Sequence, residues 1–218
     1  MKTITRFPAV DNGAIYPDIL KFIVENEFTL DINKQMKMLD LQKIIPSDKF
    51  NKIADCVLNI KKNFPSSSRK FITEDKDFDG KLVDYIPTPE FKEKWKLAEK
   101  EWVYTIMYDG RVVKIGMTSS GMSSRYTSYG AGTKKAMKKG SCATTNFVVS
   151  QCNYLALLKG MKVEIFAYEI PSTTTKQIIF GRQEEVLNKV AHHYEYVLIN
   201  LYKNHMNGCI PFLCGQEG

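Results

Sequence analysis

The dipeptide Asp109-Gly110, set between two apolar runs, is the feature that most constrains how this chain can fold. Residues 102–108 (WVYTIMY) precede it and residues 111–115 (RVVKI) follow it. Both runs are rich in β-branched and aromatic residues, and an Asp-Gly pair readily adopts the positive φ angles of a two-residue hairpin turn. The sequence therefore predicts an antiparallel β-hairpin over residues 102–115, to which the other elements must be fitted.

The residues after the hairpin predict three helices and one further strand. Helical patterns cover residues 122–130 and 144–160, and a strand pattern covers residues 161–170 (MKVEIFAYEI). A final helix is predicted over residues 182–204, with Glu195 at the edge of its buried stripe. The residues of this stripe are Leu187, Val190, Ala191, Tyr194, Leu198 and Leu201.

The first hundred residues have mostly helical patterns, over residues 16–28, 31–45, 49–64 and 88–101. In the last of these, Thr88 can cap a helix and Pro89 fits its first position. We therefore expect an α+β protein with a helical amino-terminal lobe over residues 1–98. Residues 99–218 would form the core, a small antiparallel β-sheet flanked by helices.

Composition and charge indicate a soluble chain with a polyanionic partner. Hydrophobic residues make up 44% and charged residues 25%, and 31 basic against 24 acidic residues give a net charge of +7. Such a balance favours nucleic acid, although it also serves solubility. No apolar run approaches the roughly 20 residues that span a bilayer, and the first residues lack the apolar core of a signal peptide. We expect a cytoplasmic protein without a membrane partner.

The sequence argues against a disulfide framework, a zinc site and a calcium-binding loop. The five cysteines contain no Cys-x-x-Cys pair, which argues against a disulfide framework and a zinc site, and no two of the three histidines are four residues apart. Residues 75–80 (DKDFDG) match the first half of a calcium-binding loop. However, Ile86 occupies the place of its bidentate glutamate, so an Asp-Gly turn is the better interpretation.

Five side chains between positions 99 and 218 together suit phosphoryl chemistry. Lysine and arginine stabilise charge on phosphate oxygens, a carboxylate can hold a divalent metal, and a tyrosine near an ammonium can have a lowered pKa. The arginine and the second tyrosine are four residues apart, so both project from one helical face. The five residues are Tyr104, Lys114, Arg125, Tyr129 and Glu195.

The order of these residues resembles the GIY-YIG nuclease superfamily, and more narrowly its branch of type II restriction endonucleases in which the second signature reads K-I-G. Trp102-Val103-Tyr104 matches a degenerate first signature, and Lys114-Ile115-Gly116 matches the second. Similarity continues through SYGAG, GSCATTNF, KVEIFAYEIP, an Ile-Phe-Gly around Phe180 and the closing IPFLCG. It covers roughly the last 115 residues and not the first hundred.

The resemblance implies hydrolysis of DNA phosphodiesters with one divalent cation, Mg²⁺ or another such as Mn²⁺, held by Glu195. Tyr104 would accept the proton of the attacking water, with the ammonium of Lys114 stabilising its phenolate across the hairpin. Arg125 and Tyr129 would hold the phosphate. Most members have tyrosine in place of Lys114, and many have an asparagine after the catalytic helix, for which Asn204 and Asn207 are candidates.

Residues 133–146 supply candidates for binding DNA. Lysines suit phosphates, and polar side chains of moderate length can reach base edges. The lysines could instead form a solvated face, and Thr144 and Thr145 could instead cap the following helix. The candidates are Lys134, Lys135, Lys138, Lys139, Ser141, Thr144, Thr145 and Asn146.

The function expected from this resemblance is that of a type II restriction endonuclease, which cuts both strands of double-stranded DNA at a short palindrome. A palindromic target implies a homodimer. A cognate DNA methyltransferase would belong to the same system without being a physical partner. The alternatives are a phage or mobile-element GIY-YIG nuclease of looser specificity and a non-catalytic DNA-binding module. Residues 1–98 would embrace DNA or form the dimer interface.

Overall fold

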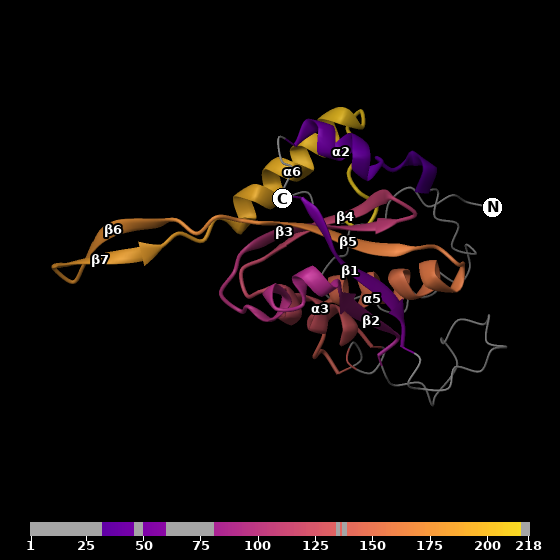
Figure 1. Cartoon of the computed structure of the whole chain (residues 1–218), viewed down its shortest axis with the longest axis horizontal. Helices are drawn as coiled ribbons and strands as arrows, with labels where there is room; N and C mark the ends of the chain where they lie inside the picture. The colour runs from indigo at the N-terminus through magenta and orange to yellow at the C-terminus, as the bar shows by residue number, and fades with distance from the viewer. Residues whose placement is uncertain (1–31, 46–49, 60–80, 134–135, 137–138, 215–218) are drawn as a thin grey trace.

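The structure is a computed structural model that describes residues 32–45, 50–59, 81–133, 136 and 139–214 (Figure 1). The helix predicted over residues 16–28 and the turn predicted at residues 75–80 lie outside these ranges. Within residues 31–45, the predicted helix is present as a 3-10 turn, Ile32–Lys34 (η1), and a short helix, Met38–Ile44 (α2).

A five-stranded antiparallel sheet forms the centre of the protein, with strand order β2-β1-β5-β3-β4. The predicted hairpin is confirmed as β3-β4, and its turn residues Asp109 and Gly110 have φ angles of 47° and 76°. The predicted strand after it is confirmed as β5. The strands are β1 Asn51–Leu58, β2 Val83–Pro87, β3 Trp102–Tyr108, β4 Arg111–Thr118 and β5 Val163–Glu169.

Helices cover both faces of this sheet. In Figure 1, α3 and α5 lie on one side of the sheet, whereas α2 and α6 lie on the other. Alternate residues of β3 enter two separate cores: Tyr104 packs on the side of α3 and α5, and Val103 packs on the side of α6. The predicted helices over 122–130 and 144–160 are confirmed. The longer helices are α3 Met122–Gly130, α5 Thr144–Leu158 and α6 Ala191–His205.

The helix predicted over residues 49–64 is wrong for residues 51–58, which form β1. This strand pairs with β2 on one side and β5 on the other, and it buries Ile53, Ala54 and Cys56. A register shift between Lys52 and Ala54 interrupts the alternation of buried and exposed residues, so that Ile53 and Ala54 are both buried and periodicity alone does not identify the strand. Two strands from before residue 98 therefore belong to the central sheet and not to a helical lobe.

The helix predicted over residues 88–101 is also wrong. Two 3-10 turns, Pro89–Phe91 (η2) and Lys94–Lys96 (η3), replace it. Phe91 contacts the edge of the Trp102 ring, with centroids 6.4 Å apart, and Trp95 stacks on Tyr126 at 5.2 Å. These aromatic contacts hold the segment against the core, and tertiary packing overrides its helical propensity.

The final helix begins at residue 191, nine positions later than predicted. Residues 182–187 instead form β7 (Arg182–Leu187), which pairs with β6 (Thr174–Ile179) across a turn at Phe180-Gly181. Both turn residues have positive φ, as in the β3-β4 hairpin. Accordingly Leu187 is exposed, as is Tyr194, and α6 buries Ala191, Leu198 and Tyr202.

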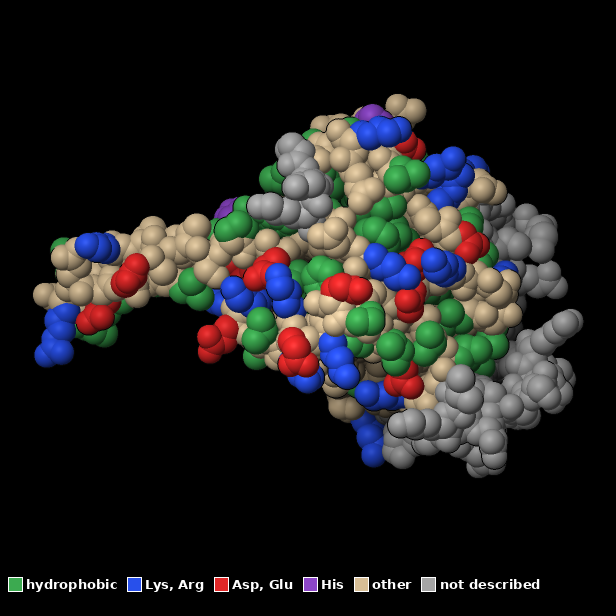
Figure 2. Space-filling model, in the orientation of Figure 1, with side chains coloured by type: hydrophobic (Ala, Val, Ile, Leu, Met, Phe, Trp, Pro, Cys, Tyr) green, Lys and Arg blue, Asp and Glu red, His purple; other side chains and the backbone are tan. Residues whose placement is uncertain are grey.

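The β6-β7 hairpin projects from the body of the protein as a two-stranded arm (Figures 1 and 2). Only Val186 among its strand residues is even partly buried. Its tip is apolar, since Ile178 is 81% exposed and Phe180 is fully exposed.

None of the helices in the described part of the chain is long and apolar enough to cross a membrane.

Glu101 fixes the start of α6. Its side chain is buried at the beginning of β3, and its two carboxylate oxygens accept hydrogen bonds from the backbone N–H groups of Val190 (3.0 Å) and Ala191 (3.3 Å). These donors have no partner within the helix, and a carboxylate also complements the positive end of the helix dipole. Glu101 therefore sets where Glu195, one turn later, is presented.

Replacing Glu101 by alanine should lower the free energy of unfolding by about 1–2 kcal/mol, because the helix loses its capping acceptor. Urea unfolding monitored by circular dichroism measures this difference. The matched control is Glu99→Ala, since Glu99 is exposed two residues earlier in the chain. Equal stability of the two variants would show that the carboxylate does not cap α6.

Candidate active site

Tyr104 lies in the middle of β3, and its ring crosses the neighbouring strand above Gly116. The two residues are directly paired in the sheet. A Cβ atom at Gly116 would lie 2.5 Å from the phenol oxygen of Tyr104 and 2.6 Å from its Cζ. The glycine of the K-I-G sequence therefore provides the space that the phenol occupies, and any larger residue would displace it.

The phenol oxygens of Tyr104 and Tyr129 are 2.5 Å apart, which joins β3 to α3 by a short hydrogen bond. Burial raises the pKa of Tyr104 well above its ordinary value, and the charges of Tyr129 and Tyr126 act in the same direction. The positive charge of Arg125 lowers the pKa of Tyr104 by a smaller amount. In the free protein Tyr129 is the direct hydrogen-bond partner of the phenol, so the stabilisation of a Tyr104 phenolate by Lys114 stays a prediction.

Arg125 lies beside this pair of phenols. Its guanidinium is 5.9 Å from the centre of the Tyr129 ring and donates a hydrogen bond to the carbonyl of Met117 at 2.9 Å. Burial alone would lower the pKa of Arg125, but the acidic groups of Tyr104, Tyr129 and Glu195 outweigh it and raise the pKa. Arg125 is only partly buried, so its guanidinium remains available to an anion.

Lys114 is 8% exposed, and its ammonium donates a hydrogen bond to the carbonyl of Leu213 at 3.3 Å. Burial alone would lower the pKa of Lys114. The acidic groups of Cys214, Tyr129 and Glu195 outweigh it and raise the pKa, so the side chain stays charged. In the sheet Lys114 pairs with Ile106, on the same face as Tyr104. Its ammonium interacts electrostatically with Tyr129 and Glu195.

Glu195 lies one turn into α6 and is partly buried. Burial raises the pKa of its carboxyl group, whereas the positive charges of Lys114, His192 and Arg125 lower it by a smaller amount. The predicted metal ligand therefore lies within electrostatic range of both predicted cations. α6 and α3 thus bring their charged groups to one place.

Glu195 can contribute one carboxylate to a binding site for a divalent cation. No group of three or more His, Cys, Asp or Glu side chains in the described ranges could hold a metal by itself. Mg²⁺, however, is commonly bound by one or two carboxylates together with substrate phosphate and water. Glu195 supplies such a single carboxylate, so the site suits a cation that arrives with, or is completed by, a phosphate.

The five predicted catalytic residues are therefore brought together, from β3, β4, α3 and α6. Two cations and one carboxylate interact electrostatically with one another, and both cations interact with the pair of hydrogen-bonded phenols. Such a set can bind a phosphate anion, stabilise charge that develops on its oxygens, and transfer a proton through a phenol. Sequence reasoning noted Gly116 in the K-I-G sequence and the closing IPFLCG, but it gave no positioning role to the residues that place these groups, which are Glu101, Gly116, Leu213 and Cys214. The spacing of a sequence carries no signal for contacts of this kind.

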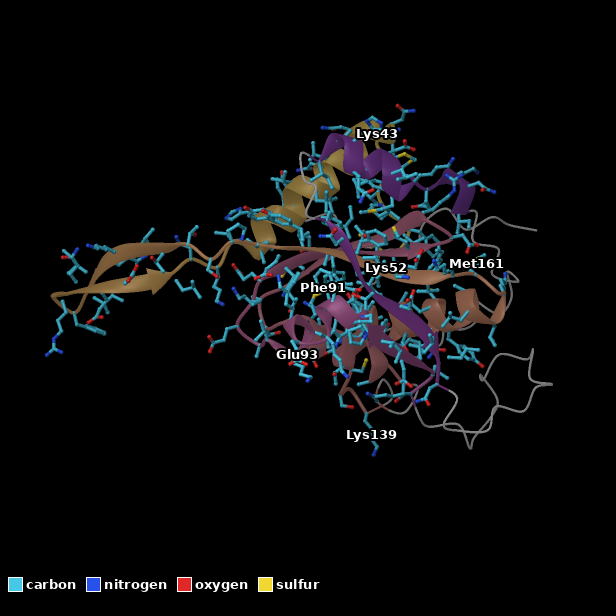
Figure 3. The ribbon with its side chains drawn as sticks, in the orientation of Figure 1. Lys43, Lys52, Phe91, Glu93, Lys139 and Met161 are labelled. Carbon is cyan, nitrogen blue, oxygen red and sulfur yellow. The ribbon has the colours of Figure 1, made fainter. Side chains whose placement is uncertain are left out.

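The predicted DNA-binding residues are only partly placed. Lys134, Lys135 and Lys138 lie outside the described residues, and Lys139 is exposed and projects outward from the body (Figure 3). The hydroxyl of Ser141 donates to the carbonyl of Ala136 at 3.1 Å.

The capping role considered for Thr144 and Thr145 is not seen. Ala143 is the N-cap of α5, and it makes no side-chain capping hydrogen bond. Thr145 is exposed, and Thr144 and Asn146 are partly buried. All three side chains stand at the amino-terminal end of α5, where the helix dipole favours an anion, so their role in DNA binding stays a prediction.

The two asparagine candidates lie apart from Glu195. Asn204 is exposed nine residues further along α6, which is about 13 Å along the helix axis. Asn207 is exposed in the turn after the helix, where its φ is 52°. A positive φ is adopted more readily by asparagine than by most residues, so the turn itself explains Asn207.

Basic side chains do not gather on the face shown in Figure 2, where they are interleaved with acidic ones. Several form ion pairs, such as Lys52 with Glu164 (2.9 Å) and Lys94 with Glu169 (2.9 Å). Paired charges attract a polyanion weakly. This face therefore does not present a concentrated positive charge to a polyanion.

Two solved nucleases are similar in structure to this chain. Restriction endonuclease HPY188I, in complex with product DNA, is 21% identical, and the match covers 86% of this chain and 90% of that one with a TM-score of 0.48. A mutant of bacteriophage T4 EndoII is 19% identical, over 47% of this chain and 67% of that one, with a TM-score of 0.33. No family model and no curated protein matches the sequence. At such low similarity, the functional argument rests on the geometry of the site itself.

Replacing Gly116 by alanine should lower the free energy of unfolding by about 1–3 kcal/mol, because the new methyl group overlaps the Tyr104 phenol. The matched control is Gly130→Ala in α3, where a Cβ atom would make an ordinary contact, 3.6 Å from Lys81 Cδ. That control should be neutral or slightly stabilising. Urea unfolding of both variants measures the difference, and a stable Gly116→Ala protein would contradict the close approach.

Proposed function

We propose that this protein is a DNA endonuclease that hydrolyses phosphodiester bonds at the site formed by Tyr104, Lys114, Arg125, Tyr129 and Glu195. The observation that carries the proposal is the convergence of two cations and one carboxylate on the Tyr104–Tyr129 pair. A phosphodiester is an anion that needs positive charge around its oxygens and a proton acceptor near the attacking water. This site offers both.

In the proposed mechanism, the guanidinium of Arg125 binds a non-bridging oxygen of the scissile phosphate. Tyr104, as phenolate, takes the proton of the attacking water. The Tyr129 hydroxyl keeps its proton and donates a hydrogen bond to that phenolate, since the two oxygens are already 2.5 Å apart. Lys114 acts through Tyr129 and the phosphate, because its charge is coupled to Tyr129. This assignment replaces the direct Lys114–Tyr104 pair that the sequence suggested.

Glu195 is the residue that would hold Mg²⁺ or Mn²⁺. When bound, the cation stabilises the negative charge of the leaving 3′ oxygen. The carboxylate must be ionised for this role, and its partly buried position next to Lys114 and Arg125 keeps it available for a cation that shares the phosphate.

The finer proposal is a type II restriction endonuclease that acts as a homodimer on a short palindrome, with a separate methyltransferase protecting host DNA. The support for it is the K-I-G sequence at Lys114–Gly116 together with the basic balance of the chain. The competing functions are a nuclease of loose specificity and a DNA-binding module without activity.

Digestion of a defined plasmid with Mg²⁺ separates these three functions. Discrete fragments indicate a restriction endonuclease, and sequencing their ends gives the recognition site and the cut stagger. A smear or nicked circles indicate a nuclease of loose specificity. Retarded but uncut DNA, with Mg²⁺ and with Mn²⁺, would rule out the proposed hydrolysis.

The cleavage rate should rise with pH through the neutral and mildly alkaline range, by about tenfold per unit. The reason is that the pKa of Tyr104 is raised by burial, so the phenolate is a small fraction that grows with pH. Single-turnover cleavage at several pH values measures this dependence. Tyr104→Phe should abolish cleavage, whereas Tyr196→Phe, which alters an exposed tyrosine of α6, should not. A flat profile above pH 7 would contradict the role of Tyr104.

Glu195→Gln should abolish Mg²⁺-dependent cleavage and at the same time stabilise the protein at pH 7, by about 1 kcal/mol. The pKa of Glu195 is raised in the folded state, so its contribution to stability is present at acid pH and is lost as pH rises through that pKa. Glutamine removes this pH-dependent loss. Thermal unfolding should show the gain at pH 7 and little difference near about pH 4.

The control for this variant is Glu184→Gln on the exposed arm, which should change neither activity nor stability. Unchanged cleavage by Glu195→Gln would remove the metal assignment.

A further inference from the structure

The last described residues of the chain, Pro211–Cys214, run along the free edge of the sheet; we call them the carboxy-terminal strap. β4 is the edge strand. The backbone N–H of Leu213 donates to the carbonyl of Val113 at 2.7 Å. The Cys214 sulfur accepts from the N–H of Ile115 at 3.2 Å, and its thiol donates to the Ile115 carbonyl at 3.3 Å. The strap thus binds β4 on both sides of Lys114.

Between these two attachments, the strap supplies the acceptor for the Lys114 ammonium. Lys114 Nζ donates to the Leu213 carbonyl at 3.3 Å. A buried ammonium needs hydrogen-bond acceptors, and a carbonyl provides one without cancelling the charge. The full positive charge therefore remains for Tyr129 and for a bound phosphate.

Lys114 also interacts electrostatically with Glu195. A direct ion pair between them would occupy the carboxylate proposed to hold the cation. The Leu213 carbonyl gives the Lys114 ammonium a hydrogen-bond acceptor other than this carboxylate.

The strap is also tied to the helix that carries Glu195. The N–H of Phe212 donates to Gln35 Oε1 at 3.1 Å, and the hydroxyl of Tyr202 in α6 donates to the same oxygen at 3.0 Å. Phe212, Leu213 and Cys214 are all buried. Its position is therefore fixed by β4 on one side and by α6, through Gln35, on the other.

We propose that the carboxy-terminal strap is a positioning element of the active site. The Leu213 carbonyl orients the Lys114 ammonium, and Cys214 is the positioning residue that holds this carbonyl in place through its two hydrogen bonds with Ile115. The proposal rests on the proposed function only for the catalytic consequence, since the placement of Lys114 can be measured in the absence of DNA.

The first test is the reactivity of Lys114 toward formaldehyde and a borohydride reductant, followed by mass spectrometry of the methylated lysines. Cys214→Val keeps the shape of the side chain but removes both hydrogen bonds, whereas Cys214→Ser keeps a donor and an acceptor. Lys114 methylation should be about tenfold faster in Cys214→Val than in the unaltered protein, and nearly unchanged in Cys214→Ser. Cys209→Ala, which alters an exposed thiol, is the matched control, and Lys52 is the internal reference.

The second test separates chemistry from binding. Cys214→Val should lower the single-turnover cleavage rate by about tenfold to a hundredfold while DNA affinity stays within about twofold, since misplacing a group affects the transition state more than the bound substrate. Cys214→Ser should restore the rate. If Cys214 had only a structural role, Cys214→Val would instead lower the melting temperature and the fraction of active protein. The cleavage rate would then not fall selectively relative to DNA affinity.

Unchanged Lys114 methylation in Cys214→Val would overturn the proposal, and so would an equal rise at Lys52 and Lys114, which would indicate general loosening. Selective methylation of Lys114 in a protein that never cleaves DNA has a different meaning. That result would reject the proposed nuclease function and leave the placement of Lys114 by the strap established.

Discussion

The extra residue in β4 decides which side chains share the face of Tyr104. Next to the turn, Met107 pairs with Val112, and the same register continued would set Ile115 opposite Tyr104 and turn Lys114 to the other face. The register shift after Ile106 sets Gly116 opposite Tyr104 instead. A single bulge therefore makes room for the phenol and turns the ammonium to its side of the sheet. The bond to Tyr129 and the anchoring of Lys114 both depend on this register.

The bulge also explains how far the site could be predicted from the sequence. Residue types, their order along the chain and the family resemblance carried by that order selected five residues that the fold brings together, namely Tyr104, Lys114, Arg125, Tyr129 and Glu195. The pairing among them was not predictable, because it depends on one inserted residue that leaves no mark in composition or period. Sequence reasoning accordingly gave Tyr104 a lysine partner, whereas the fold gives it a tyrosine.

The wrong secondary-structure predictions have a similar origin. The β3-β4 hairpin was predictable because its Asp-Gly turn and its alternating strands agree. β1 was not, because a register shift between Lys52 and Ala54 interrupts the alternation that identifies a strand. In the arm, Gln183, Glu184 and Glu185 favour a helix by propensity, and only Gly181 indicated a turn. Local signals were therefore reliable where they agreed with one another, and misleading where tertiary contacts decided the structure.

The exposed arm divides the protein into two parts with different energetics. Its strands bury almost no side chain, so the arm contributes little to the free energy that holds the sheet and its helices together. Its two ends leave β5 and return to the start of α6, where Glu101 fixes the chain. The length and sequence of the arm can therefore vary through evolution without moving Glu195, and the reach of the protein can change independently of its chemistry.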